Sequence, residues 1–280
     1  MNSAIGQIHH GTAATSTMFG LFCRLMPRLA ANVSMLFPEL DFLDRFAAAR
    51  AAGFRYVEYQ FPYAWPAAEI ARRAQDAGVQ VVLHNLPAGD RAQGERGIAC
   101  LPGREREFRD AIERAIEYAA AVSCPRLNCL AGLAPADARH FATLVPNLRL
   151  AARRLGEVGI QLMIEPINTR SVPGFFLTRS SQAIDVLNAV GEMNAFLQYD
   201  AFHMQIMEGD LARTVERLLG RIGHIQIADA PDRHEPGTGE INFGFLLAHL
   251  DAIGYSGWVG CEYNPRGDTL EGLKWAKPYL

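Results

Sequence analysis

Residues 161–168 read QLMIEPIN, a short apolar run followed by a glutamate. Three later segments repeat this plan: FLQYDAFH at residues 196–203, GHIQIAD at 223–229 and GWVGCEYNP at 257–265. Each run has the length and apolar character of a buried strand, and amphipathic stretches of helical period separate the runs. This alternation predicts an α/β fold in which several strands end in polar side chains.

The same alternation extends back along the chain to Arg28. The expected strands are Leu29–Ser34, Tyr56–Gln60, Val79–His84, Arg126–Leu130, Gln161–Glu165, Phe196–Asp200, His224–Ala228 and Trp258–Glu262. The expected helices are Asp41–Ala52, Ala67–Ala77, Arg104–Ala121, Ala136–Val158, Ser180–Val190, Asp210–Leu219, Phe243–Ile253 and Thr269–Ala276. Several of these helices end at a glycine, as at Gly53 and Gly159, which suits a left-handed C-terminal cap.

Eight strand–helix units over about 250 residues give about 31 residues per unit, which predicts a (β/α)8 TIM barrel. An open, doubly wound sheet is the alternative, but it normally carries a glycine-rich phosphate loop after its first strand. Residues 31–40, ANVSMLFPEL, contain no glycine. No linker rich in Gly, Ser or Pro divides the region, so we expect a single domain over residues 27–280.

Residues 1–26 differ from the barrel region because they contain no acidic residue and show no clear period. We expect a disordered N-terminal extension, with a targeting segment as the alternative. The basic residue Arg24 follows the apolar run Met18–Cys23, whereas a signal peptide needs its basic segment first. We interpret the pair His9–His10 as incidental.

The composition is typical of a globular protein with a sizeable core, since 49% of the 280 residues are hydrophobic and 20% are charged. A net charge of −3 gives no general attraction to nucleic acid or anionic membranes. No apolar run approaches the roughly 18 residues of a membrane span. The five cysteines form no CxxC pair and are expected to be reduced thiols of a cytoplasmic protein. We expect a small-molecule partner and leave assembly into a homo-oligomer open.

In a TIM barrel the active site lies at the C-terminal ends of the strands. Four consecutive strands end there in oxygen-bearing side chains, namely Glu165, Asp200, Gln226 and Glu262, which lie 35, 26 and 36 residues apart. A lone carboxylate at a strand end is usually a helix cap or an ion-pair partner, but three that converge would repel one another. A divalent cation removes that repulsion, and four oxygen donors suit Mg²⁺, or Mn²⁺, better than a soft metal.

Histidines near the expected mouth are candidates for hydrogen bonds to a substrate. His84 ends the third strand and His203 follows the sixth, and for each a structural role is an equal alternative. His224 lies two residues before Gln226, on the same side of its strand but deeper, and is expected in the core. Glu58 lies near the end of the second strand.

Two kinds of nucleophile are disfavoured by their positions. A Schiff-base aldolase needs a lysine at the barrel mouth, but the only lysines, Lys274 and Lys277, lie in the last expected helix. Cys261 alternates away from Glu262, toward the surrounding helices, which argues against a nucleophilic cysteine.

Two loops are long and polar, residues 84–103 and residues 229–242, and loops of this length in a compact domain are usually functional. Arginines in or near these loops are candidates for a bidentate contact with a substrate carboxylate. They are Arg91, Arg96, Arg104 and Arg233. For any one of them, a surface ion pair with Glu95, Glu105 or Asp232 is an equal alternative.

Several long motifs resemble one known family. They are MLFPELDFLDRF, LHNLPAGD, GERGIACLPGRE, LMIEPIN, QYDAFHMQ, HIQIADAPDRHEPGTGEINF and GWVGCEYNPRGDTLEGLKWAK. Together they resemble the hydroxypyruvate isomerase and 2-oxo-tetronate isomerase family, within the xylose-isomerase-like barrel superfamily. The resemblance covers Arg28 to Lys277, in order and at matching spacing, but it does not separate the members of the family.

The resemblance implies a TIM barrel with a divalent metal bound by Glu165, Asp200, Gln226 and Glu262, and proton transfer by Glu165 and Glu262. The implied reaction converts hydroxypyruvate into 2-hydroxy-3-oxopropanoate through an enediolate. Related ketose epimerases carry a histidine on the seventh strand, where this chain has Gln226. A neutral amide oxygen is a harder donor and favours Mg²⁺ further.

Four alternatives accompany this prediction. A 2-oxo-tetronate isomerase would act on a four-carbon sugar acid, and a ketose epimerase would invert a carbon without forming an aldehyde. A sugar-acid binding protein would need no proton-transferring pair. An apurinic endonuclease of the same superfamily would need more histidines at strand ends and a basic face for DNA.

Overall fold

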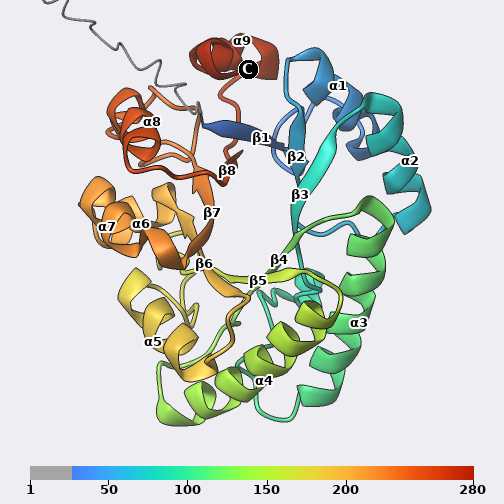
Figure 1. Ribbon diagram of the computed structural model, residues 1–280, viewed down its shortest axis with the longest axis vertical. Helices are drawn as coiled ribbons and strands as arrows, with labels where there is room; N and C mark the ends of the chain where they lie inside the picture. Colours follow the sequence, from blue (N-terminus) through green and yellow to red (C-terminus); the bar gives the residue numbers. More distant parts are fainter. Residues whose placement is uncertain (1–26) are drawn as a thin grey trace, which may run out of the picture.

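The structure of the protein, a computed structural model, describes residues 27–280 (Figure 1). The predicted extension of residues 1–26, with its His9–His10 pair, lies outside the described residues.

Eight parallel strands close into a barrel in the order β1 to β8, and β1 pairs with both β2 and β8. The strands are β1 Arg28–Asn32, β2 Tyr56–Glu58, β3 Gln80–Asn85, β4 Arg126–Cys129, β5 Gln161–Ile164, β6 Ala195–Asp200, β7 Ile222–Ile227 and β8 Trp258–Cys261. Helices surround the barrel, as Figure 1 shows in a view close to its axis. The predicted single-domain TIM barrel is confirmed, and each predicted strand lies within a few residues of an observed one.

The helices follow the strands in the predicted order. The α-helices are α1 Arg45–Ala51, α2 Ala67–Ala77, α3 Glu105–Val122, α4 Ala138–Glu157, α5 Ser180–Val190, α6 Ala201–Met207, α7 Leu211–Leu218, α8 Phe243–Ala252 and α9 Thr269–Gly272. Short 3-10 helices are η1 Phe42–Asp44, η2 Arg91–Gln93, η3 Leu219–Arg221 and η4 Leu273–Tyr279. No helix within residues 27–280 has the length and hydropathy needed to cross a bilayer.

Two helical segments differ from the sequence-based expectation. The short helix α6 directly follows β6, because the Asp200 side chain at its N-cap accepts backbone hydrogen bonds from Phe202 and His203. The predicted last helix, Thr269–Ala276, is a single α-helical turn that continues as a 3-10 helix, with Pro278 near its end. A proline has no N–H to donate to an α-helical bond, which favours ending the α-helix early.

The interior of the barrel is polar toward the C-terminal ends of its strands. Its fully buried polar side chains include Asn32, Glu58, His84, Asn128, Gln198, His224 and Gln226. A TIM barrel is usually filled by branched apolar side chains, so this concentration of polar groups marks the functional end of the barrel. Elsewhere apolar side chains fill the space between strands and helices in one continuous core.

Gly223 in β7 is a position where the core has no room for a side chain. A Cβ atom there would lie 2.7 Å from Met163 Cε and 2.8 Å from Phe196 Cβ. We expect Gly223→Ala to lower the free energy of unfolding by about 1–3 kcal/mol through overpacking. The matched control is Gly220→Ala, whose Cβ would meet no atom within 4 Å. Urea unfolding of both variants checks this, and equal effects would contradict it.

Candidate active site

The four predicted strand-end residues lie at the C-terminal mouth of the barrel. Glu165 follows β5, Asp200 ends β6, Gln226 is the penultimate residue of β7 and Glu262 follows β8. All four are buried, with at most 5% of the residue surface exposed. Asp200 and Gln226 are direct partners in the pairing of β6 with β7. The regular strand–helix spacing therefore brings these side chains to one end of the barrel, as expected.

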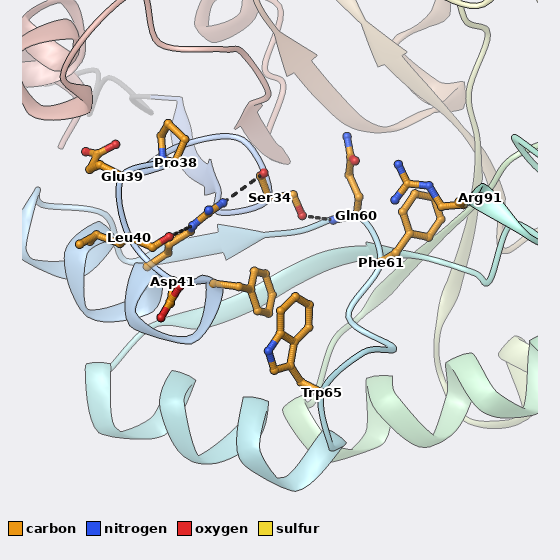
Figure 2. Close-up of a pocket in the computed structure, with 11 residues that line it drawn as sticks. Ser34, Pro38, Glu39, Leu40, Asp41, Gln60, Phe61, Trp65 and Arg91 are labelled. Carbon is orange, nitrogen blue, oxygen red and sulfur yellow. Dashed lines mark hydrogen bonds between the residues drawn. The ribbon is translucent and has the colours of Figure 1, made fainter. Parts of the chain in front are cut away.

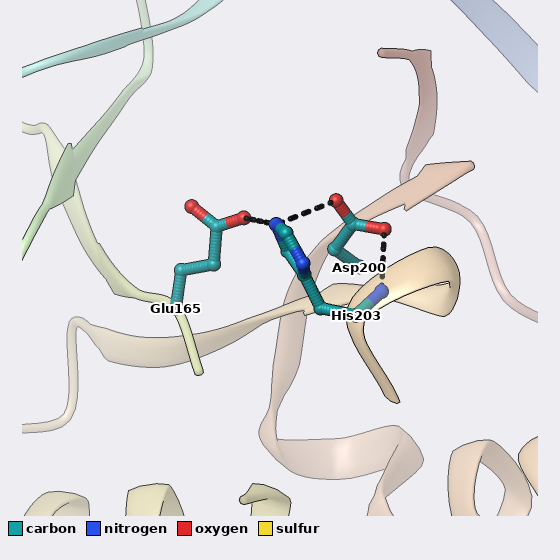
Figure 3. A group of neighbouring side chains, drawn as sticks. All are labelled: Glu165, Asp200 and His203. Carbon is teal, nitrogen blue, oxygen red and sulfur yellow. Dashed lines mark hydrogen bonds and ion pairs between the residues drawn. The ribbon is translucent and has the colours of Figure 1, made fainter. Parts of the chain in front are cut away.

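Glu165, Asp200 and His203 form one compact group, with one potential ligand atom of each within 4.8 Å of the others (Figure 3). His203 Nε2 lies 3.9 Å from Glu165 Oε1 and 3.6 Å from Asp200 Oδ2. Asp200 Oδ1 caps α6, accepting the backbone N–H of Phe202 at 2.8 Å, while Oδ2 is buried without a hydrogen bond from any described residue. Asp200 Oδ1 thus caps the helix α6, while Asp200 Oδ2 faces His203.

The protonation of His203 is set by its neighbours. Asn168 Oδ1 accepts the backbone N–H of Ser171 at 2.6 Å, so the Asn168 amide nitrogen faces His203 Nδ1, also at 2.6 Å. Nδ1 is therefore the acceptor, and Nε2 carries the proton of the neutral ring. Burial lowers the pKa of His203 well below its ordinary value, with a further contribution from Arg233. His203 consequently presents an N–H donor toward the two carboxylates.

Arg233 places a positive charge among the carboxylates. Its Nη2 lies 2.5 Å from Glu262 Oε2 and 3.7 Å from Asp200 Oδ2. The sequence indicated Arg233 only as one of several candidates for a substrate contact, and its ion pairs are here inside the mouth rather than on the surface.

The loop that carries Arg233 is folded by a single carboxylate. Asp229 accepts backbone N–H bonds from Gly237, Gly239 and Ile241 at 2.8–3.0 Å. Arg233 itself has a φ of 62°, a conformation that few non-glycine residues adopt. The sequence shows Asp229 after β7, but it does not show that its carboxylate gathers the loop and turns Arg233 inward.

The two glutamates are each held by amide donors. Asn128 Nδ2 donates to Glu165 Oε2 at 2.8 Å. Gln60 Nε2 and Asn32 Nδ2 donate to Glu262 Oε1 at 3.0 and 3.2 Å. Sequence reasoning missed Asn32 and Gln60, although both lie at or just after the ends of the first two strands, where such groups gather.

Burial, with contributions from neighbouring acidic groups, raises the pKa values of all three carboxylates. The pKa of Glu165 lies well above its ordinary value, first because of burial and then because of Glu262 and Asp200. Burial raises the pKa of Asp200 to about 7, although Arg233 opposes this. Burial also raises the pKa of Glu262, and Arg233 again opposes the shift. A buried group of carboxylates with raised pKa values, in which Asp200 Oδ2 accepts no hydrogen bond, fits a divalent cation.

Both polar atoms of the Gln226 side chain form hydrogen bonds, below the three carboxylates. Its Nε2 donates to Glu58 Oε1 at 2.7 Å, and its Oε1 accepts from Gln198 Nε2 at 2.7 Å. A carbonyl oxygen has a second lone pair, so Oε1 retains one acceptor position. His224, predicted to lie in the core, is fully buried, with Nε2 2.6 Å from Glu58 Oε2.

His84 is buried at the end of β3, with its ring stacked 5.7 Å from that of Tyr59. Its Nδ1 lies 3.2 Å from the Asn85 carbonyl oxygen, and its Nε2 is buried without a hydrogen-bond partner among residues 27–280. Burial lowers its pKa to about 4, so the ring is neutral near pH 7. Its substrate contact stays a prediction.

A cavity of about 540 Å³ lies beside Gln60, Trp65 and Arg91 (Figure 2). Gln60, which donates to Glu262, lines this cavity together with the basic residues Arg45 and Arg91 and the acidic residues Glu39 and Asp41. The Arg91 guanidinium lies 4.1 Å from the centre of the Phe61 ring and has no acidic partner in the described part of the chain. The neighbouring Arg104 instead pairs with Glu95 and Glu107, much as the surface alternative predicted.

Comparisons with known proteins agree on one family. Residues 46–279 match the family described as the xylose isomerase-like TIM barrel. The hydroxypyruvate isomerase of Escherichia coli is 51% identical over 257 residues, which cover 91% of this chain and all of the relative. The 2-oxo-tetronate isomerase of Cupriavidus necator is 50% identical over 258 residues, covering 91% of this chain and 99% of the relative. A crystal structure from Brucella melitensis, described as an AP endonuclease of family 2, is 46% identical with a TM-score of 0.89, covering 91% of this chain and 99% of that one. The resemblance inferred from the sequence motifs is confirmed.

Asp200→Asn is expected to stabilise the metal-free protein at alkaline pH. Because burial raises the pKa of Asp200 to about 7 from an ordinary 3.8, the folded state keeps a proton that the unfolded state has lost between these values. Stability of the unsubstituted protein should therefore fall as the pH rises through this window, and the variant should lack the part of that loss that comes from Asp200. At pH 8 in EDTA, urea unfolding should show that the free energy of unfolding of the variant exceeds that of the unsubstituted protein by on the order of 1–4 kcal/mol. An unchanged pH dependence in the variant would contradict the burial argument.

Proposed function

Because the chain belongs to the xylose isomerase-like TIM barrel family, we propose that it is an aldose–ketose isomerase that interconverts hydroxypyruvate and 2-hydroxy-3-oxopropanoate. The observation that carries this proposal is the pair Glu165 and Glu262, two buried carboxylates on β5 and β8 that face one polar mouth. Isomerisation moves a proton between adjacent carbons, and positioned carboxylates accept and return it.

Each glutamate is suited to this transfer because amide donors fix one of its oxygens. Asn128 binds Glu165 Oε2, which leaves Oε1 directed toward His203. Gln60 and Asn32 bind Glu262 Oε1, which leaves Oε2 to Arg233. In our proposal Glu165 Oε1 and, once Arg233 is displaced, Glu262 Oε2 face the reacting carbons, and the amide-bound oxygens keep the side chains from rotating away.

We propose that Glu165, Asp200, Gln226 and Glu262 hold a divalent cation, Mg²⁺ in preference to Mn²⁺ because all four donors are oxygens. The cation would supply electrostatic stabilisation of the enediolate oxygens, worth several kcal/mol in such reactions. The Oδ2 atom of Asp200, which accepts no hydrogen bond, and the raised pKa values of the three carboxylates support the site. His203, with its proton on Nε2, is then a hydrogen-bond donor to a substrate oxygen, and His84 is a second substrate contact.

An acid substrate suits the charges around the mouth. Arg233 lies between Glu262 and Asp200, and Arg91 lines the adjacent cavity without an acidic partner within residues 27–280. A substrate carboxylate could pair with Arg91, which is exposed, or with Arg233, which is largely buried among the acidic groups. A neutral ketose offers no such partner, which favours an acid substrate over the epimerase alternative.

A 2-oxo-tetronate isomerase is the second candidate, because relatives of both names match this chain almost equally. Purified protein with Mg²⁺ should convert hydroxypyruvate to the semialdehyde, measured with a coupled reductase. Faster turnover of 2-oxo-tetronate would move the assignment to the second candidate. Inversion of a ketose without an aldehyde product would indicate an epimerase. Binding without entry of solvent deuterium into the substrate carbon would indicate a sugar-acid binding protein.

We also propose a cytoplasmic location, where thiols stay reduced. All four cysteines in the described part of the chain, Cys100, Cys124, Cys129 and Cys261, are free and buried. An endonuclease role is less well supported than isomerase activity. The compact ligand group of the described residues contains one histidine and two carboxylates, whereas we expect a zinc-dependent endonuclease to use more histidines.

Glu165→Gln and Glu262→Gln should each lower kcat by at least about 100-fold, because a glutamine cannot exchange the proton. Solvent-deuterium incorporation should fall with kcat. The matched control is Cys261→Ala, next to Glu262 on β8, which should keep near-normal turnover because the thiol lies outside the proposed chemistry. Turnover by both glutamine variants at the level of this control would contradict the proton-transfer roles.

A further inference from the structure

We propose that Glu58 is a positioning residue that fixes the orientation of the Gln226 amide, so that its oxygen rather than its nitrogen is presented to the bound cation. This inference rests on the cation site of the proposed function and assigns a role to a buried carboxylate that the proposed chemistry does not use. Glu58 ends β2 and Gln226 lies on β7, with β1 and β8 between them in the barrel. The contact therefore spans the barrel interior.

Glu58 is fully buried and receives several donors at once. Gln226 Nε2 and Asn32 Nδ2 donate to its Oε1 at 2.7 and 2.9 Å, and His224 Nε2 lies 2.6 Å from its Oε2. The amide nitrogens of Gln226 and Asn32 are donors only, and both face Glu58 Oε1, which accepts from them. Each amide therefore turns a donor toward Glu58, which leaves the Gln226 amide with one favourable orientation.

Glu58, Gln226 and Gln198 form a chain of hydrogen bonds in which each amide nitrogen donates toward Glu58. Because Gln226 turns its nitrogen to Glu58, its oxygen lies on the opposite side, where it accepts from Gln198 Nε2 at 2.7 Å. Gln198 is on β6, the strand that ends in Asp200, and Asp200 pairs directly with Gln226 in the sheet. The Gln226 oxygen is thus turned toward the strand that carries a proposed ligand, and its second lone pair is available for the cation.

The backbone of β8 leaves the space that this arrangement needs. Gly260 is the β8 partner of Gln226, and a Cβ atom at Gly260 would lie 2.2 Å from Glu58 Oε2 and 2.4 Å from its Oε1. Real side chains do not approach so closely, so any residue larger than glycine at this position would displace the Glu58 carboxylate. Gly260 therefore provides a second way to perturb Glu58 without changing its chemistry.

The test is a double-mutant cycle on the affinity for Mn²⁺, measured by calorimetry on the full chain. Glu58→Gln leaves one acceptor oxygen for three donors and adds an N–H₂ group, so the Gln226 amide is free to turn round. We expect Mn²⁺ affinity to fall at least tenfold, as for other partners of metal ligands. Gln226→Met, which removes the ligand oxygen, should show a loss of at least the same size. Combined with Gln226→Met, Glu58→Gln should cause less than a twofold further loss, because the Gln226 amide that Glu58 orients is then absent.

The cycle separates positioning from two other effects of Glu58. If Glu58 attracted the cation through its charge, or only supported the fold, its substitution would weaken binding equally in the presence and absence of Gln226. Additive losses would therefore overturn the proposal, as would Mn²⁺ affinity of Glu58→Gln within twofold of the unsubstituted protein. If the unsubstituted protein bound no Mn²⁺ at all, both this inference and the proposed cation site would fail.

Two further variants guard the result against a folding defect. Gly260→Ala keeps every hydrogen-bonding side chain and should also lower Mn²⁺ affinity at least tenfold, because it displaces the Glu58 carboxylate. Normal affinity in Gly260→Ala would contradict the proposal. Glu208→Gln is the matched control. Glu208 accepts hydrogen bonds from the Ser180 backbone N–H and from the Ser180 hydroxyl, both at 2.8 Å, and it is not one of the predicted ligands. It should bind Mn²⁺ normally, and circular dichroism should show that all variants are folded.

Discussion

The architecture of the mouth depends on the cost of burying three carboxylates together. Glu165, Asp200 and Glu262 come from different strands, yet all are buried, and Glu262 raises the pKa values of both Glu165 and Asp200. Like charges in a water-poor site need a counter-charge, a shared proton or a cation. Arg233 supplies part of the counter-charge through Glu262 and Asp200. The remaining excess of acidic groups is the feature on which the proposed cation site rests.

The neutral polar groups around the carboxylates all have a fixed direction. The Ser171 N–H orients Asn168, which in turn sets the tautomer of His203. Glu58 orients Gln226 in the same way from below. In both cases a group that can only donate or only accept decides the orientation of an ambiguous neighbour. Such supporting contacts hold a site ready for its ligands and reduce the reorganisation needed during a reaction.

Sequence periodicity predicted the fold well because each strand is a short apolar run and each helix is amphipathic. It also predicted that Glu165, Asp200, Gln226 and Glu262 share one end of the barrel, since that follows from topology alone. Sequence periodicity could not predict contacts that depend on how a loop folds. The inward position of Arg233 depends on three backbone bonds to Asp229, and the His203 tautomer depends on a bond from Ser171 to Asn168. The spacing of residues along the sequence does not predict such side-chain orientations.

The central claim is that the buried acidic and amide oxygens at the ends of β5 to β8 surround a divalent cation. A crystal soaked with Mn²⁺ and measured for anomalous scattering tests it most directly. The account predicts one strong peak contacted by oxygens of Glu165, Asp200, Gln226 and Glu262, with Arg233 displaced from Glu262. A fully soaked crystal with no peak between these four side chains would contradict it.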